Sequence, residues 1–138
     1  MFVEEAMSRD PRSVSSETSV REVMRILVEN DIRHLPIVDG VCLVGIVSVR
    51  DLPAVVATGV AYFGDPHQVE QVLDQPVSNV MTTDVIAVLP KTGLGAAIDL
   101  MLEHKVGALP VVDGADTALI GILSYSDALR VVRPSLRD

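Results

Sequence analysis

Two copies of one pattern make up the sequence, and this internal duplication restricts its fold more than any other feature. A shift of 74 residues places Met81 on Met7, and after a two-residue insertion a shift of 76 places Asp127 on Asp51. The longest matching runs are residues 35–40 with 109–114 and residues 45–51 with 121–127. A single copy of about 60 residues is marginal as an independent fold, so the two copies are predicted to share one module.

Each copy contains a predicted amphipathic helix, which spans residues 19–30 in the first copy. Apolar side chains recur there at helical spacing, as on a core helix or on a helix with an exposed apolar face. They are Val20, Val23, Met24, Leu27 and Val28 in the first copy and Leu94, Ala97, Ile98, Met101 and Leu102 in the second. Ser19 and Glu22 form a predicted capping box. Gly93 and Ala96 replace this pair in the second copy, so its helix is expected to start less firmly.

A hairpin and a second helix follow the first helix in each copy. Predicted strands at residues 35–38 and 43–47 are joined by an Asp-Gly turn at 39–40, which is a strong hairpin signal. A short helix is expected to begin near Ser48, and another near Ser124.

The segment between the copies is predicted to be an ordered connector. Pro66 suits the first position of a helix that ends near Asp74. Val69, Val72 and Leu73 lie on that helix at helical spacing.

Composition narrows the class of function. A net charge of −8, with only 3% aromatic residues and no Trp, argues against a nucleic-acid partner. The N-terminus lacks a signal peptide, and no apolar run approaches the ~20 residues that span a bilayer, so we expect a cytoplasmic protein without a membrane partner. The single cysteine, Cys42, lies in an apolar run and is interpreted as a small buried hydrophobe in a reducing compartment.

The repeated run that ends in Ser-x-x-Asp carries the chemistry. A glycine, Gly45 or Gly121, lies within the preceding strand and allows close approach of a backbone or ligand. Ser followed three residues later by Asp is typical of a helix cap, which alone suffices to explain the pair. A ligand role is compatible with capping, because a helix N-terminus attracts phosphate and a carboxylate accepts hydrogen bonds from a ribose diol.

These residues resemble the cystathionine-β-synthase (CBS) domain family in its tandem arrangement, the Bateman module. The resemblance rests on the Met-Ser and Met-Thr pairs at 7–8 and 81–82, the Leu-Pro strand and the Gly-x-x-Ser-x-x-Asp run. It implies an α+β fold of two repeats, each a small sheet packed with two helices, related by a pseudo-two-fold axis. We expect repeat 1 at residues 1–60, a connector at 61–78 and repeat 2 at 79–138.

The same resemblance implies an adenosine-containing ligand in the clefts between the repeats. The ligand would be AMP, ADP, ATP, S-adenosylmethionine or an NAD-like molecule. By family position, Asp51 and Asp127 would hold the ribose, and Ser48 and Ser124 would face phosphate. Adenine would contact backbone and aliphatic groups of Arg12, Ser13, Val14, Ile86, Ala87 and Val88.

The two predicted sites differ in charge. Repeat 1 carries Arg33, His34 and Arg50, which we interpret as phosphate partners, with solvated surface charge as the competing interpretation. Repeat 2 has Gly107, Ala108 and Ser126 at the matching positions. His104, Lys105 and Arg130 are also near the second copy in sequence, but the sequence does not place them.

We do not expect an enzyme. Asp51 and Asp127 occupy equivalent positions, whereas a catalytic acid and base need environments that separate their pKa values. The histidines at 34, 67 and 104 show no metal-ligand spacing, and a phosphate-binding Walker loop is absent.

The predicted function is a stand-alone sensor that has a regulatory adenosine ligand in place of a cofactor. Ligand occupancy would shift the angle between repeats or subunits, and an unidentified regulated protein would respond to it. A homodimer is expected from the resemblance. The alternative is a ligand-free structural dimerisation module whose helices present Met24, Met101 and Leu102 to a partner.

Overall fold

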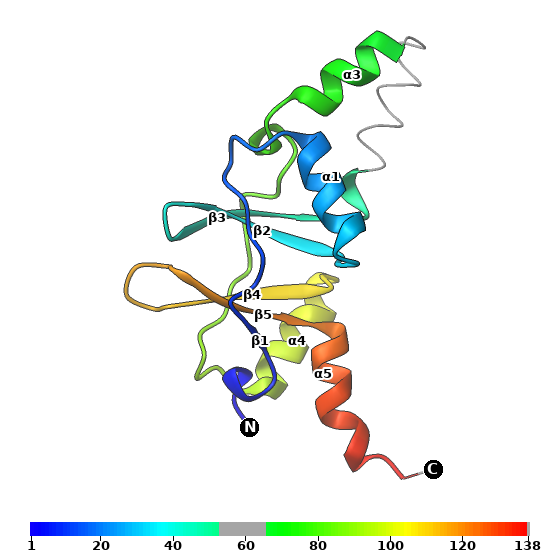
Figure 1. Ribbon diagram of the computed structural model, residues 1–138. Coiled ribbons are helices and arrows are strands. Elements are labelled where there is room, and N and C mark those ends of the chain that lie inside the picture. The colour runs from blue at the N-terminus through cyan, green and yellow to red at the C-terminus, as the bar shows by residue number, and fades with distance from the viewer. Residues whose placement is uncertain (53–65, 138) are drawn as a thin grey trace. The chain divides into compact units, whose positions relative to one another are not determined.

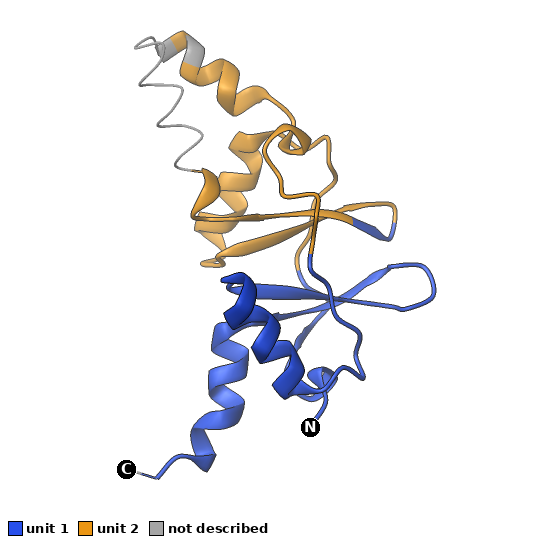
Figure 2. Ribbon diagram, turned by 180° about the vertical axis from the view of Figure 1, so that it is seen from behind, with its two compact units in different colours: residues 1–11, 41–43, 86–138 blue, residues 12–40, 44–85 orange. Residues whose placement is uncertain are grey.

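The computed structural model describes residues 1–52 and 66–137, and the chain divides into two compact units (Figure 2). Unit 1 comprises Met1–Pro11, Val41–Leu43 and Ile86–Asp138, and unit 2 comprises Arg12–Gly40 and Val44–Val85. Residues 1–11, which open the first sequence repeat, therefore belong to the unit that contains the second hairpin. The predicted boundaries of the sequence repeats and connector remain a prediction, because the units group residues by contact.

Unit 2 is built on a two-stranded sheet. Its elements in chain order are α1 (Val20–Glu29), β2 (His34–Asp39), β3 (Cys42–Ser48, of which 44–48 lie in this unit), α3 (Pro66–Asp74) and η2 (Val77–Asn79) (Figure 1). The predicted turn between β2 and β3 is confirmed, since Gly40 has a φ of 64° that favours glycine. The fully buried side chains of this unit include Leu35, Ile37 and Val47.

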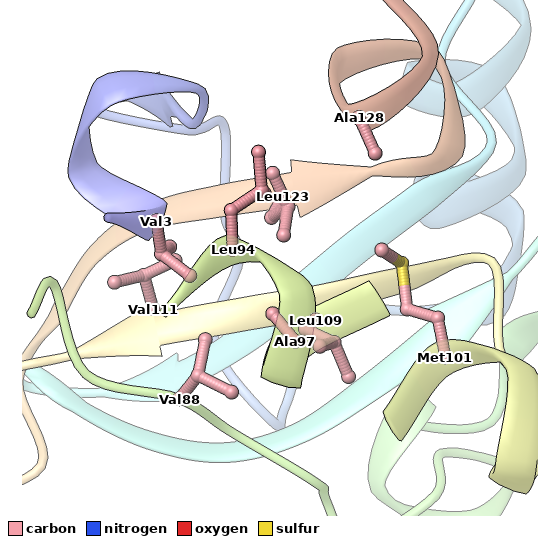
Figure 3. Packing of buried hydrophobic residues seen from close by; sticks show 9 residues of the cluster. All are labelled: Val3, Val88, Leu94, Ala97, Met101, Leu109, Val111, Leu123 and Ala128. Atoms are coloured by element: carbon pink, nitrogen blue, oxygen red, sulfur yellow. The ribbon is translucent and has the colours of Figure 1, made fainter. Parts of the chain in front are cut away.

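Unit 1 is built on a three-stranded antiparallel sheet with the order β1-β5-β4. Its elements are η1 (Val3–Glu5), β1 (Ser8–Arg9), α4 (Leu94–His104), β4 (Ala108–Val112), β5 (Leu119–Ser124), α5 (Tyr125–Val132) and η3 (Arg133–Ser135). Leu109, Val111 and Leu123 from the sheet pack with Ala97 and Met101 of α4 (Figure 3). The predicted α+β class of two repeats with small sheets and helices is confirmed.

The N-termini of α1 and α4 differ in their capping, as the sequence predicts. The Ser19 side chain caps α1 by accepting a hydrogen bond from the Glu22 N–H at 3.1 Å. The Glu22 carboxylate pairs with Arg25 on its own helix. Gly93 is the N-cap of α4 and supplies no side-chain hydrogen bond, as its lack of a side chain requires.

The apolar stripe is exposed at one position in each repeat. Val28 and Leu102 correspond under the 74-residue shift, and they are 75% and 65% exposed. The buried face of α1 turns instead toward Ile26, which the predicted stripe omitted. Met101 is buried and Met24 packs partly against the core of its unit.

The connector helix is confirmed as α3, from Pro66 to Asp74. Leu73 packs against the core of unit 2, and Arg21 of α1 forms ion pairs with Glu70 and Asp74. The rest of the predicted connector before residue 66 lies outside the described residues. No helix in the described parts of the chain has the length and apolar character needed to cross a bilayer.

Candidate functional site

The strand-to-helix turn of unit 1 forms a complete capping box. The Ser124 N–H donates to the Asp127 carboxylate at 3.0 Å, and the Asp127 N–H donates to the Ser124 hydroxyl at 3.2 Å. These reciprocal bonds satisfy two N–H groups at the start of α5. The structural interpretation of the Ser-x-x-Asp run is therefore confirmed in this unit.

Two further donors converge on the same carboxylate. The Ser8 hydroxyl of β1 donates to Asp127 Oδ1 at 3.4 Å, and Arg130, one turn further along α5, donates to this oxygen at 3.2 Å. The Asp127 side chain is 9% exposed, whereas the Arg130 side chain is 73% exposed. Buried carboxylates require such partners, because an unpaired charge away from water is costly.

The corresponding carboxylate of unit 2 has different surroundings. Asp51 is exposed, and its Oδ2 accepts a hydrogen bond from the Ser48 hydroxyl at 3.1 Å. A turn at residues 49–50 separates β3 from helical residues 51–52. The helix predicted near Ser48 thus begins later than its counterpart, and its continuation lies outside the described residues.

Basic side chains gather near Asp51. Burial lowers the pKa of the half-buried His34, the positive charges of Arg33 and Arg50 lower it further, and the Asp51 carboxylate opposes them. His34 thus experiences the charges of Arg33, Arg50 and Asp51. A hydrogen bond from the Val49 N–H to the Arg33 carbonyl, 2.8 Å long, joins the start of β2 to the motif turn.

Unit 1 has the equivalent backbone hydrogen bond, but the residues that match the basic ones are uncharged. The Tyr125 N–H donates to the Gly107 carbonyl at 3.0 Å, at positions equivalent to Val49 and Arg33. Gly107, Ala108 and Ser126 carry no charge, so unit 1 lacks basic side chains at the positions of Arg33, His34 and Arg50. The role of the basic side chains in binding phosphate stays a prediction.

The predicted adenine-contact segments run beside the first strand of each hairpin. Val14 and Val38 are linked by a 2.8 Å backbone bond, and Val88 and Val112 by one of 2.9 Å. Val88 is buried, whereas Ser13, Val14, Ile86 and Ala87 are half-buried and Arg12 is exposed. The two segments are thus equivalent in structure, and their contact with adenine stays a prediction.

The motif glycines are explained by protein packing. A Cβ added to Gly45 would lie 2.5 Å from the sulfur of Met81, and one added to Gly121 would lie 2.6 Å from the sulfur of Met7. The close approach predicted at these glycines is therefore made by the methionine that opens a sequence repeat. The same contacts hold that opening segment, with Ser8 in unit 1, next to the motif strand.

Sequence reasoning missed two of the partners of Asp127. Arg130 could have been found from its spacing, since residues three apart face each other on a helix. Ser8 lies 119 residues from Asp127 and could be connected to it only through the pairing of β1 with β5. His104 and Lys105 lie at the exposed end of α4, away from the motif in sequence and on another element.

Among the described residues, no cluster of three or more His, Cys, Asp or Glu side chains could hold a metal ion. Cys42 is half-buried rather than fully buried, and its thiol donates to the Asp116 carbonyl at 3.4 Å.

Comparison with known proteins gives two matches to the CBS domain, over residues 3–57 and 77–134. Among curated proteins, a homoserine O-acetyltransferase of Methanocorpusculum labreanum is 35% identical over 120 residues, which cover 86% of this chain and 22% of the relative. The chain thus spans about a quarter or less of such enzyme relatives. The CBS domain-containing protein YhcV of Bacillus subtilis is 27% identical, with coverage of 91% of this chain and 81% of that protein.

Solved structures match over the whole chain. CBSX2 of Arabidopsis thaliana in complex with AMP has 32% sequence identity and a TM-score of 0.82, and the match covers 99% of this chain and 98% of that one. The CBS domain pair of protein MJ0100 in complex with 5′-methylthioadenosine and S-adenosyl-L-methionine has 25% identity, the same TM-score and the same coverage.

Proposed function

This chain belongs to the CBS domain family, and from that premise we propose that it is a regulatory module that binds an adenosine-containing ligand. The observation that carries the proposal is the duplicated site. Each unit places a Ser-x-x-Asp turn after a strand and a backbone-paired segment, residues 12–14 or 86–88, beside the neighbouring strand. The AMP complex of CBSX2 and the S-adenosyl-L-methionine complex of the MJ0100 domain pair support the ligand class.

Each part of the ligand has a chemically suitable partner in this proposal. The carboxylates of Asp51 and Asp127 accept hydrogen bonds from the ribose hydroxyls. Ser48 and Ser124, at the strand-to-helix turns, face the phosphate. Residues 12–14 and 86–88 hold adenine through backbone and aliphatic contacts, which suits a chain with 3% aromatic residues.

Unit 2 is the better site for a phosphate-bearing ligand. Arg33, His34 and Arg50 bring positive charge to the neighbourhood of Asp51. An arginine donates several hydrogen bonds in a planar fork that fits phosphate oxygens. Unit 1 has uncharged residues at the equivalent positions, so there a ligand gains less from its phosphate.

The module has no reaction of its own in this proposal, and it signals to a separate regulated protein in the cytoplasm through ligand-dependent conformational change. We further propose a homodimer, for which sedimentation equilibrium is the measurement. Val28 and Leu102 are among the exposed apolar side chains that such an interface would cover.

The test is thermal unfolding with and without AMP, ADP, ATP, S-adenosylmethionine and NAD. A ligand present at about 100 times its dissociation constant adds about 2.7 kcal/mol to the unfolding free energy, which raises Tm by several degrees. We expect at least one adenosine ligand to produce this shift and guanosine monophosphate to produce none.

A ligand-free dimerisation module is the second candidate, and it would use exposed apolar side chains such as Val28 and Leu102. This candidate predicts an unchanged Tm with every nucleotide, whereas a Tm that rises with protein concentration is expected of both candidates because both are dimers. An unchanged Tm with every nucleotide would replace the sensor proposal.

A further inference from the structure

The two ribose-binding carboxylates of the proposed function differ in how many of their acceptor positions are already occupied. A carboxylate has about four lone-pair sites on its two oxygens. Asp127 uses its Oδ2 for the Ser124 N–H and its Oδ1 for both the Ser8 hydroxyl and the Arg130 guanidinium. Asp51, within the described residues, accepts a hydrogen bond from the Ser48 hydroxyl only.

Burial increases this difference. The Asp127 side chain is 9% exposed, so most of its surface is already covered by protein. Asp51 is exposed to solvent. A ribose diol brings two O–H donors, and these can replace water at Asp51. At Asp127 the three protein donors leave about one acceptor position open, so a diol donates both of its hydrogen bonds there only if it displaces a donor of the protein.

From these contacts we infer that Arg130 and Ser8 restrain the ribose carboxylate of unit 1, so that unit 2 binds the adenosine ligand first. The inference rests on the proposed function and adds the order in which the two sites fill. Arg130 is the stronger restraint, because its hydrogen bond is charge-assisted and shorter than that of Ser8.

Arg130 is also able to move away. Its side chain is 73% exposed, so its charge can return to water when a ligand takes its place. An exposed ion pair contributes modestly to stability, and its displacement therefore weakens binding without preventing it. Unit 1 remains a functional site that responds at higher ligand concentration than unit 2.

The experiment isolates unit 1 by using an Asp51→Asn background and adenosine as the probe. Adenosine has the ribose diol but no phosphate, so a change in affinity reports on the carboxylate and not on attraction of an anion to Arg130. Calorimetric titration then compares this background with the same protein carrying Arg130→Ala, Arg130→Lys or Ser8→Ala. Arg137→Ala is the matched control, since it removes an exposed positive charge beyond α5.

We expect Arg130→Ala to tighten adenosine binding by roughly fivefold, as removal of a mostly exposed ion pair would give. Ser8→Ala should give a smaller gain in affinity. Arg130→Lys, which keeps a charged donor, should restore affinity toward that of the background, whereas a merely structural role would not produce this rescue.

Unchanged or weaker adenosine binding in Arg130→Ala would overturn this inference and leave the proposed function standing, as would equal tightening by Arg137→Ala. If neither adenosine nor AMP binds the wild-type protein or any variant, both the inference and the proposed function fail.

Discussion

Gly45 and Gly121 occupy equivalent positions in the two units, and at both positions there is no room for a side chain. Each lies in a strand where the sulfur of a methionine and a backbone carbonyl oxygen crowd the position that a Cβ would take. Replacement by Ala therefore forces the methionine and the strand apart. The motif glycine lets the segment that opens a sequence repeat pack closely against the strand. In unit 1 this segment contains Ser8, whose hydroxyl donates to Asp127.

Gly121→Ala should destabilise the protein by about 1–3 kcal/mol, as overpacking of a close contact does. The Cβ would lie 2.6 Å from the Met7 sulfur and 3.0 Å from the Ser8 carbonyl oxygen. Urea unfolding measures the change. Gly95→Ala is the control, because nothing lies within 4 Å of an added Cβ and helices favour Ala over Gly. A Gly121→Ala protein as stable as the wild type would contradict this packing explanation.

The lowered pKa of His34 predicts the sign of a pH dependence of the stability. Its pKa in the folded protein is lowered from 6.5, first by burial and then by Arg33 and Arg50. Between that lowered value and 6.5 the unfolded chain binds more protons, so the unfolding free energy rises with pH. The contribution is fully present above pH 6.5 and is lost as pH falls through the folded-state pKa.

Urea unfolding of wild type and His34→Gln between pH 5 and 8 measures this dependence, with His104→Gln as the control at an exposed position. The wild-type minus His34→Gln difference in unfolding free energy should increase toward pH 6.5 and then become constant. A difference that decreases over this range would show that the folded protein favours charged His34.

At the scale of elements, α1 and α4 form a natural pair for comparison, because they occupy equivalent places and start differently. Ser19 caps α1 with its side chain, whereas Gly93 at α4 cannot. The backbone of Gly93 has the extended conformation that a serine cap adopts, with φ −62° and ψ 138°.

Ser19→Ala should lower the unfolding free energy by about 1 kcal/mol, and Gly93→Ser should raise it by roughly a few tenths of a kcal/mol. The midpoint of urea unfolding measures both changes. If the two substitutions shift the midpoint in the same direction, the difference between the two helix starts does not arise from side-chain capping.

At the scale of the whole molecule, the duplication made most of the fold predictable. The Asp-Gly turn at 39–40, the connector helix and the start of α1 all carry local signals, which is why these elements could be placed from sequence. The exposure of Val28 and Leu102 could not be predicted, because helical periodicity gives the direction of an apolar stripe and not its width.

The site was only partly predictable, because only some of its contacts join residues that are close in sequence. Ser124 and Asp127 form a local motif and were identified, whereas the Ser8 hydroxyl reaches Asp127 through strand pairing across most of the chain. Such long-range pairing leaves no spacing to recognise. The compact units likewise depend on contacts of residues 1–11 and 77–85 that no local pattern indicates.

The measurement that tests the central claim most directly is calorimetric titration of AMP into the Asp51→Asn/Asp127→Asn double variant. Asparagine keeps an amide oxygen that can accept the Ser124 N–H, so the turn is expected to stay folded, and circular dichroism checks this. If the two carboxylates hold the ribose of the nucleotide, the wild-type protein binds AMP and the folded double variant does not. Binding by the folded double variant with wild-type stoichiometry and affinity would contradict the account.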